Sequence, residues 1–371
     1  MGAHSFLPPS GANAWVHCAV WPTMNRLYPQ DDTADTLVGE AAHWVLSERF
    51  AGRSPQEGDR APNDERIDRD MVNHVSDVFG WFTSEFPVQQ FEEAWTEQRL
   101  AIPSIHSICF GTPDRAQLAP THIAILDFKY GHRFVHEREN WQNLSYLRGV
   151  LDALIARGWT DFSRIRFSLA IAQPRAYDRR GSFRVWEIPA GSDLTHYWTA
   201  LYNGAINALQ ENPRATTGDH CLDCPGRAKC PALRASGQNV VSVSGFAPPL
   251  DLTALEAAAE LEQLRRAEAI LKARTKGLED ELEAAYNRGE RNFGYAMDRS
   301  LGRSAWTVPV EKAIQLGQLY GVDISRPGVA TPLQAISAGI PSDVVKKYSE
   351  RPLGEQKLVK VEQTLAYRAF F

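Results

Sequence analysis

Long apolar segments are absent from this 371-residue sequence, which contains no run of about 18 apolar residues of the kind that marks a membrane-spanning helix. The N-terminal segment also lacks the basic start and following apolar stretch of a secretory signal. These two absences predict a cytoplasmic protein that has no membrane partner.

Cysteine is scarce, and its distribution is uneven. An odd count of five, without a secretory signal, argues against a framework of disulfides. Cys221, Cys224 and Cys230 fall within ten residues, in the pattern C-x2-C-x5-C. Because a C-x2-C turn can direct two thiolates at one ion, this segment predicts a metal or cluster site.

A strong excess of positive charge is also missing. The 40 basic residues are outnumbered by 45 acidic ones, which gives a net charge of -5. Composition by itself therefore does not indicate that the protein binds nucleic acid. It is compatible with a local basic groove around a centre that concentrates carboxylates.

The length predicts two units, or one large unit with an appendage, and the hydrophobic fraction of 43% is enough for a real core. Residues 1–30 and 51–66 are rich in turn formers and predict loops, and residues 234–250 predict a linker. Apolar periodicity predicts helices from Asp32 or Thr33 onward and over 67–86, 139–157, 194–209 and 251–288. Strand character predicts an antiparallel meander over 95–102, 104–110, 115–118 and 122–130, followed by a strand over 164–172.

The most informative segment is residues 123–131, where an apolar strand ends in Asp127, a spacer and Lys129. Strand alternation puts Asp127 and Lys129 on one face. Asp114 lies thirteen residues before Asp127 in Gly-Thr-Pro-Asp, and a hairpin between these segments would bring the two acids together. Two carboxylates that share a site repel each other unless a cation neutralises them, so the pair predicts a divalent metal.

A lone Asp-x-Lys is far more often an ordinary strand end than a catalytic motif, so its context decides the interpretation. Gln142 and Tyr146 are four residues apart and share a helix face, although such residues are also common as a cap and a core tyrosine. His43 lies in the first predicted helix, where a structural histidine is the commoner role. Glu97 is a further candidate acid.

In this order and spacing, His43, Gly-Thr-x-Asp114, Asp127-x-Lys129 and Gln142-x-x-x-Tyr146 resemble the RecB-type branch of the PD-(D/E)XK nuclease superfamily. The resemblance covers roughly residues 10–235. It is strongest to a phage-encoded group catalogued as a domain of unknown function, which shares the Ser-Gly-Ala start and a C-terminal extension like residues 290–371.

The resemblance implies an α/β fold with a restriction-endonuclease-like core, in which helices flank a central mixed sheet, followed by a helical and α+β C-terminal extension. It implies that His43, Asp114 and Asp127 bind Mg²⁺ or Mn²⁺, that Lys129 assists catalysis, and that the helix with Gln142 and Tyr146 contacts substrate. The second acid is Asp127, where Glu is commoner in that branch.

The cysteines allow zinc or iron, because four thiolates suit either. Cys18 is the candidate fourth ligand, whereas Cys109 is expected to be a buried apolar residue. The spacing alone favours zinc slightly. The resemblance favours a [4Fe–4S] cluster on Cys18, Cys221, Cys224 and Cys230, because one cysteine before the core and three after it is the arrangement of cluster-containing nucleases. Such a cluster would close a very long loop.

The expected organisation is a nuclease core with the cysteine cluster over 1–240, a long helix over 251–290 and a small α+β domain over 291–371. Leu264, Leu271, Leu278 and Ala285 repeat every seven residues, which is typical of a coiled-coil seam. We expect this helix to mediate assembly or partner docking, with an intramolecular arm as the alternative.

The predicted function is that of a metal-dependent DNA exonuclease in phage recombination or DNA processing, located in the host cytoplasm if a phage encodes it. Its expected partner is DNA, as a single strand or a duplex end. A recombination or single-strand annealing protein and a second copy of the chain are candidate partners. The alternatives are a catalytically silent DNA-binding or scaffold protein of the same fold and a zinc-stapled RNA-processing nuclease.

Overall fold

The computed structural model divides the chain into two compact units, Met1–Arg274 and Thr275–Phe371, each of which is described by itself. The residues that the structure describes are 5–29, 33–176, 178–243, 253–291, 293–301, 304–326 and 328–360.

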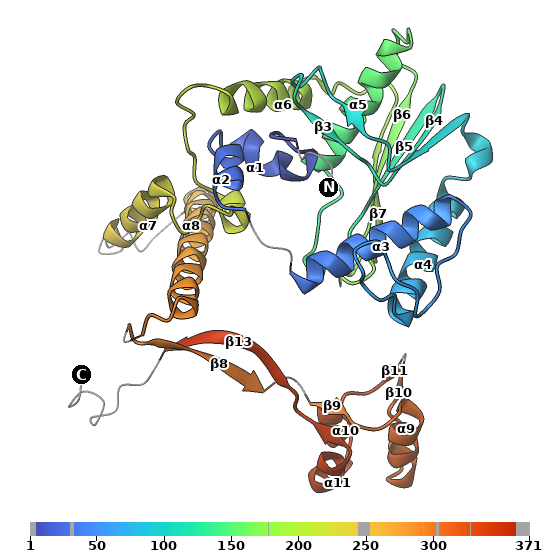
Figure 1. The fold of residues 1–371 in the computed structure, drawn as a ribbon, viewed down its shortest axis with the longest axis vertical. Coiled ribbons are helices and arrows are strands. Elements are labelled where there is room, and N and C mark those ends of the chain that lie inside the picture. The colour runs from blue at the N-terminus through green and yellow to red at the C-terminus, as the bar shows by residue number, and fades with distance from the viewer. Residues whose placement is uncertain are drawn as a thin grey trace. The chain divides into compact units, whose positions relative to one another are not determined.

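The first unit is built on a five-stranded mixed sheet with the strand order β1-β4-β5-β6-β7 (Figure 1). β5 and β6 run parallel, whereas the other neighbours are antiparallel. α5 (Trp141–Ala156) connects the two parallel strands. The strands are β1 (Glu93–Thr96), β4 (Arg115–Ala119), β5 (His122–Phe128), β6 (Arg166–Ala172) and β7 (Phe183–Ile188), and a separate short hairpin pairs β2 (Leu100–Ala101) with β3 (Phe110–Gly111).

Helices cover both faces of this sheet, so its central strands are buried on both sides. All seven residues of β5 are buried. Ile123 and Ile125 pack into a core with α1, α5 and α6, and Leu126 and Phe128 pack into a second core with α3 and α4 (Figure 1). Asp127 follows the alternation of Ile123 and Ile125 and therefore faces α5.

Capping side chains begin the helices that carry site residues. Thr33 accepts a hydrogen bond from the backbone N–H of Thr36 at the start of α3, and Asn140 accepts from those of Gln142 and Asn143 at the start of α5. The α-helices of this unit are α1 (Ala12–His17), α2 (Trp21–Leu27), α3 (Ala34–Phe50), α4 (Arg69–Glu85), α6 (Thr195–Ala208) and α7 (Pro231–Val243), with 3₁₀ turns at Pro9–Gly11, Val88–Gln90 and Asp219–Asp223.

α8 (Ala254–Asn287) begins in the first unit and ends in the second. The second unit has a small core that includes Ala313, Ile324 and Ile340. Its elements are β8 (Tyr295–Leu301) paired with β13 (Leu353–Lys360), β9 (Ala305–Trp306) paired with β12 (Ser349–Glu350), β10 (Ser325–Arg326) paired with β11 (Gly328–Val329), and the helices α9 (Val310–Leu319), α10 (Pro332–Ser337) and α11 (Ser342–Lys347).

The expected central mixed sheet flanked by helices is confirmed, as is the C-terminal helical region. The meander prediction holds for β1, β4 and β5, but residues 104–109 form turns and β7 was not predicted. Residues 1–30 were expected to be loops, yet they form α1 and α2. Residues 234–243 of the expected linker are helical, and residues 244–252 lie outside the described chain. Among the described helices, none is both long enough and apolar enough to span a bilayer.

Candidate metal centre and cysteine site

The carboxylates of Glu97, Asp114 and Asp127 lie at one edge of the sheet, where β1 and β5 end and β4 begins. Thr96 pairs with Arg115, so Glu97 and Asp114 are the next residues opposite each other, and the Glu97 N–H donates to the Asp114 carbonyl at 3.3 Å. Arg115 pairs with Leu126, which in the same way brings Asp114 opposite Asp127. The register of the sheet therefore aligns Glu97, Asp114 and Asp127.

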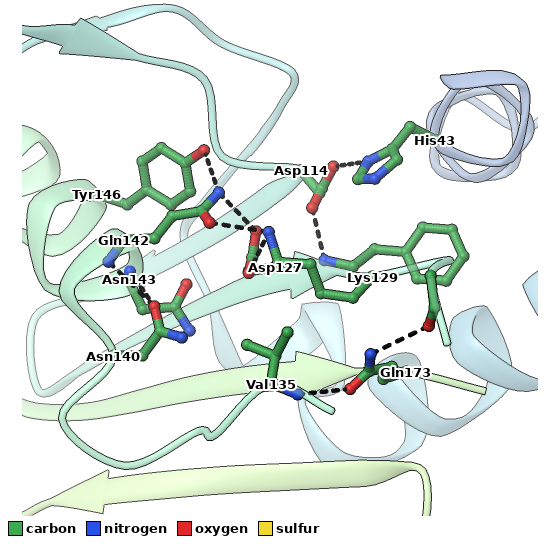
Figure 2. A network of polar contacts seen from close by, with 12 residues as sticks. His43, Asp114, Asp127, Lys129, Val135, Asn140, Gln142, Asn143, Tyr146 and Gln173 are labelled. Atoms are coloured by element: carbon green, nitrogen blue, oxygen red, sulfur yellow. Dashed lines mark hydrogen bonds and ion pairs between the residues drawn. The ribbon is translucent and has the colours of Figure 1, made fainter. Parts of the chain in front are cut away.

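His43 reaches this row of acids from α3. Its Nδ1 lies 2.5 Å from Asp114 Oδ1, while the other Asp114 oxygen accepts the backbone N–H of Phe128 at 2.6 Å (Figure 2). One ligand atom from each of His43, Glu97 and Asp114 lies within 4.8 Å of the other two. Imidazole and carboxylate are common ligands of divalent metals, so this group could hold one ion.

Lys129 and two residues of α5 surround Asp127 (Figure 2). Lys129 Nζ lies 3.1 Å from Asp127 Oδ2 and donates to Gln142 Oε1 at 2.8 Å. Gln142 Nε2 donates to Asp127 Oδ1 at 3.1 Å and to the Tyr146 hydroxyl at 2.9 Å. Asp127 Oδ2 is buried without a hydrogen bond, so one carboxylate oxygen has only the ammonium group to balance it.

Burial and neighbouring charges move the pKa values of these groups in opposite directions. Burial alone would raise the pKa of Asp114, but the adjacent His43 holds it below its usual value. Burial would lower the pKa of His43, yet the charge of Asp114 raises it. The pKa of Asp127 is raised by burial despite the nearby Lys129.

Glu97 is an exposed residue, but its carboxyl group lies beside Asp114. Partial loss of hydration and then the charge of Asp114 raise its pKa to about 8. Its backbone has φ 48, in the left-handed region that side chains other than glycine seldom adopt. Crowding of acids together with backbone strain is typical of a functional site rather than of a stabilising one.

These side chains line an open cavity of about 640 Å³. Besides the seven residues already described (His43, Glu97, Asp114, Asp127, Lys129, Gln142 and Tyr146, together called the strand-end site), Trp44 and Glu40 of α3 and Thr112 contribute to its wall. The cavity is large enough to admit part of a polymer substrate to the carboxylates.

The structure brings together all six residues that the sequence predicted for this site. The three-residue metal group contains Glu97, the further candidate acid, in the place expected for Asp127. Asp127 lies beside Lys129 instead, outside the set of three atoms. The sequence contains one feature that indicates Glu97, since it is an acid directly after a strand that pairs with the strand of Asp114.

The four cysteines Cys18, Cys221, Cys224 and Cys230, together called the cysteine site, line one small cavity at the end of α1. Their sulfurs do not form a tight group, because no three of them lie within 4.8 Å of one another in the described part of the chain. Burial raises the pKa of Cys224 to about 11, and the neighbouring cysteines add to the shift.

Cys109 lies apart from this cavity. Its thiol is buried and donates to the carbonyl of Leu7 at 3.2 Å, and burial raises its pKa to about 12. The expectation of a buried, apolar role for Cys109 is confirmed.

One ion pair connects the two sites. Arg133, four residues after Lys129, binds the carboxylate of Asp223, which lies between Cys221 and Cys224. Both side chains are more than half exposed, so the pair contributes little to stability. It does show that the loop after Lys129 lies against the C-x2-C turn.

Comparison with known proteins gives one matching family and several distant structures, including two crystal structures. A family model described as "Protein of unknown function (DUF2800)" matches residues 4–316. No curated protein matches the chain. The crystal structure of a "Putative exonuclease" from Eubacterium rectale is similar at a TM-score of 0.36 and 10% identity, covering 69% of this chain and 93% of that one. The crystal structure of SSO0001 is similar at a TM-score of 0.24 and 14% identity, covering 58% of this chain and 95% of that one.

Proposed function

We propose that this chain, which belongs to the DUF2800 family, is a metal-dependent nuclease that hydrolyses DNA phosphodiester bonds. The observation that carries the proposal is the meeting of His43, Glu97 and Asp114 within 4.8 Å beside the Asp127–Lys129 pair. We assign it to the RecB-type branch of the PD-(D/E)XK nucleases on the order and spacing of these residues and of Gln142 and Tyr146.

The residues present fit Mg²⁺ or Mn²⁺. Asp114, Glu97 and His43 offer two carboxylates and an imidazole, and Asp127 Oδ2 is a buried oxygen without a hydrogen bond. Loss of hydration and then repulsion from Asp114 raise the pKa of Glu97, and a cation at this point would relieve that repulsion. When bound, such an ion supplies activation of water and neutralisation of charge on the phosphate.

The chain's own residues would position the substrate and the attacking water. Lys129 is three-quarters buried and held by Asp127 and Gln142, so its charge is aimed into the cavity, where it can stabilise the phosphate as charge develops. Hydrolysis adds the water oxygen to phosphorus and breaks one P–O ester bond. The products are a phosphate monoester end and a hydroxyl end.

The proposed substrate is a single strand or an opened duplex end, and the proposed role is that of an exonuclease in phage recombination or DNA processing. Gln142 and Tyr146 support this choice, since they line the cavity next to the carboxylates, where they can contact a single strand. The proposed partners are DNA and, in a phage, a recombination or annealing protein.

The test is digestion of end-labelled single-stranded and duplex DNA with Mg²⁺, with Mn²⁺ and with a chelator. Wild-type protein should cut only with metal. Asp127→Asn should fold but lose cleavage by several orders of magnitude, because a neutral amide removes the anionic oxygen that would face the metal and that holds Lys129. Folded Asp127→Asn that cuts at the wild-type rate, with contaminating nuclease excluded, would contradict the assignment. A wild-type protein that binds DNA without cutting it would favour the catalytically silent alternative.

For the cysteine site we propose a [4Fe–4S] cluster on Cys18, Cys221, Cys224 and Cys230. The four cysteines line one cavity, which supports a single group shared by all of them. The choice of a [4Fe–4S] cluster over zinc rests on the order of the cysteines along the sequence, with one before the core and three after it. The cluster would connect α1 to the segment after α6 and stabilise the core.

A further inference from the structure

A second large cavity, of about 690 Å³, lies in the first unit away from the strand-end site. Three segments line it, namely the end of α1, the turn that leads to Cys221, and α8. Its residues, together called the α8 cavity, are Asn13, His17, Thr216, Thr217, Gly218, Asp219, His220, Glu262, Arg265 and Arg266.

α8 forms one wall of this cavity and is held there by packing against the segment that contains Cys221 and Leu233. Ile270 and Ala273 are buried against Cys221 and Leu233, and Arg274 donates to the carbonyl of Ala228 at 3.0 Å. One turn or two before these contacts, the same helix presents Arg265 and Arg266 to the cavity. Part of α8 therefore packs within the first unit and forms one wall of this cavity.

The lining combines cationic groups with flat rings. Arg265 pairs with Glu262 at 3.1 Å, whereas Arg266 forms no ion pair with a described residue. The imidazoles of His17 and His220 are stacked, with ring centroids 6.0 Å apart. Arginine binds phosphate oxygens through its forked donors, and stacked rings give a surface for a base.

A ring contact leads from the α8 cavity to the start of α5, the helix that carries Gln142 of the strand-end site. The ring of His17 meets the edge of Trp141 at a centroid distance of 5.9 Å. Trp141 begins α5, and the next residue is Gln142, which contacts Asp127 and Lys129. A strand held in the strand-end site could extend past Trp141 to the arginines.

We propose that the α8 cavity binds the DNA single strand next to the phosphate that is cleaved, with Arg265 and Arg266 on backbone phosphates and the His17–His220 pair against a base. This inference rests on the proposed function and deepens it. The acids Asp219 and Glu262 in the same wall make the cavity a poor site for a small free anion, so the strand gains affinity by using the rings and the arginines together.

The test is binding of a fluorescent oligothymidylate to the full-length protein in chelator, followed by fluorescence anisotropy over a range of salt concentrations. Arg265→Gln/Arg266→Gln should bind several-fold more weakly. Its slope of log Kd against log salt should fall by about 1.4, which corresponds to about 0.7 for each phosphate of a single strand that an arginine no longer neutralises. Arg265→Lys/Arg266→Lys should keep most of the slope, since the charges remain.

Lys272→Gln/Lys276→Gln is the matched control, because it removes the same charge from α8 outside the cavity. It should leave affinity within twofold. Equal weakening by both double variants, or an unchanged slope in Arg265→Gln/Arg266→Gln, would overturn the proposal. Cleavage of a dinucleotide, too short to reach the α8 cavity, should be the same in both variants and wild type.

The two proposals fail in different ways. If the wild-type protein cuts no DNA with any metal but still binds the oligonucleotide through Arg265 and Arg266, the nuclease assignment fails and the α8 cavity stands. If it cuts long and short substrates and the arginine variant binds normally, the α8 cavity assignment alone is wrong.

Discussion

The strand-end site and the cysteine site are assembled by different means. Glu97, Asp114 and Asp127 lie on strands that pair directly, so hydrogen bonds of the sheet position them before any ligand binds. Cys18 and Cys221 belong to segments that share no strand pairing and that meet around a cavity. We expect a site of the first kind to put strain into a fold that is stable without it, and a site of the second kind to contribute to the stability of the fold once it holds the proposed cluster.

Cys18→Ser gives the largest effect expected from this comparison. Loss of one ligand should release the iron and lower the midpoint of thermal unfolding substantially, because it opens a loop of about two hundred residues. Anaerobically purified wild-type protein should be brown, with broad absorbance near ~400 nm. The measurements are iron content, absorbance and calorimetry.

Cys109→Ser is the matched control for Cys18→Ser and should retain the iron, since its thiol lies outside the cavity. A colourless wild-type protein with one zinc per chain would exclude iron. An unchanged unfolding midpoint in metal-free Cys18→Ser would break the comparison, because the cysteine site would then contribute nothing to the fold.

Lys129→Met should lower the rate of cleavage by about 10²–10³-fold, the usual cost of removing one group that stabilises transition-state charge. Metal affinity, measured by calorimetry with Mn²⁺, should stay near that of the wild type, because Lys129 is not a ligand. Loss of metal binding in a folded Lys129→Met protein would show that the ammonium group holds Asp127 in place.

Glu97→Gln tests whether the strand-end site strains the fold. A carboxyl group whose pKa is raised from 4.5 to about 8 in the folded protein destabilises it progressively as pH rises from about 4.5 to about 8, and the full penalty remains above that range. Metal-free Glu97→Gln should therefore be more stable than metal-free wild type at pH 9 and nearly equal to it at pH 4, as measured by denaturant unfolding. Equal stabilities at both values would show that Glu97 is ordinary and solvated.

Tyr146→Phe should have the smallest effect. It removes the hydroxyl that accepts a hydrogen bond from Gln142 while it leaves the ring in the core. The expected loss of cleavage rate is about fivefold or less, equivalent to about 1 kcal/mol for one hydrogen bond. A loss as large as that of Lys129→Met would assign the hydroxyl a direct part in the reaction.

Local pattern was sufficient for the elements that position the strand-end site. The apolar run ending at Asp127 and the capped helix with Gln142 were enough to predict β5 and α5. Asp114 and Asp127 are close in the sequence, so the hairpin that joins their strands was also predictable. Glu97 was harder to recognise because its role depends on which strand pairs with β4. That pairing skips the β2–β3 hairpin, so sequence distance gave no indication of it.

Elements held by distant contacts were not predictable in the same way. α1 is short and begins among prolines and glycines, and it is stabilised by packing of Trp15 and Ala12 with α6. The strand β7 contains Arg184 and Glu187, which weaken its apolar alternation, and Arg184 is buried by contacts with Glu137 and Gln173. The heptad leucines of α8 indicated a seam, but Ile270 and Ala273 make the observed contact, while Leu264 and Leu271 are exposed.

The complete burial of β5 has a consequence for the timing of ligand binding. Amide protons of a central strand covered on both faces exchange with solvent only when the whole unit opens. Asp127 is part of this slowly exchanging strand, so its carboxylate cannot follow a metal ion by a backbone shift. For the proposed metal, selection between a small ion such as Mg²⁺ and a larger one would then fall to the side chains that come from outside the strand, His43 on its helix and Glu97 directly after β1.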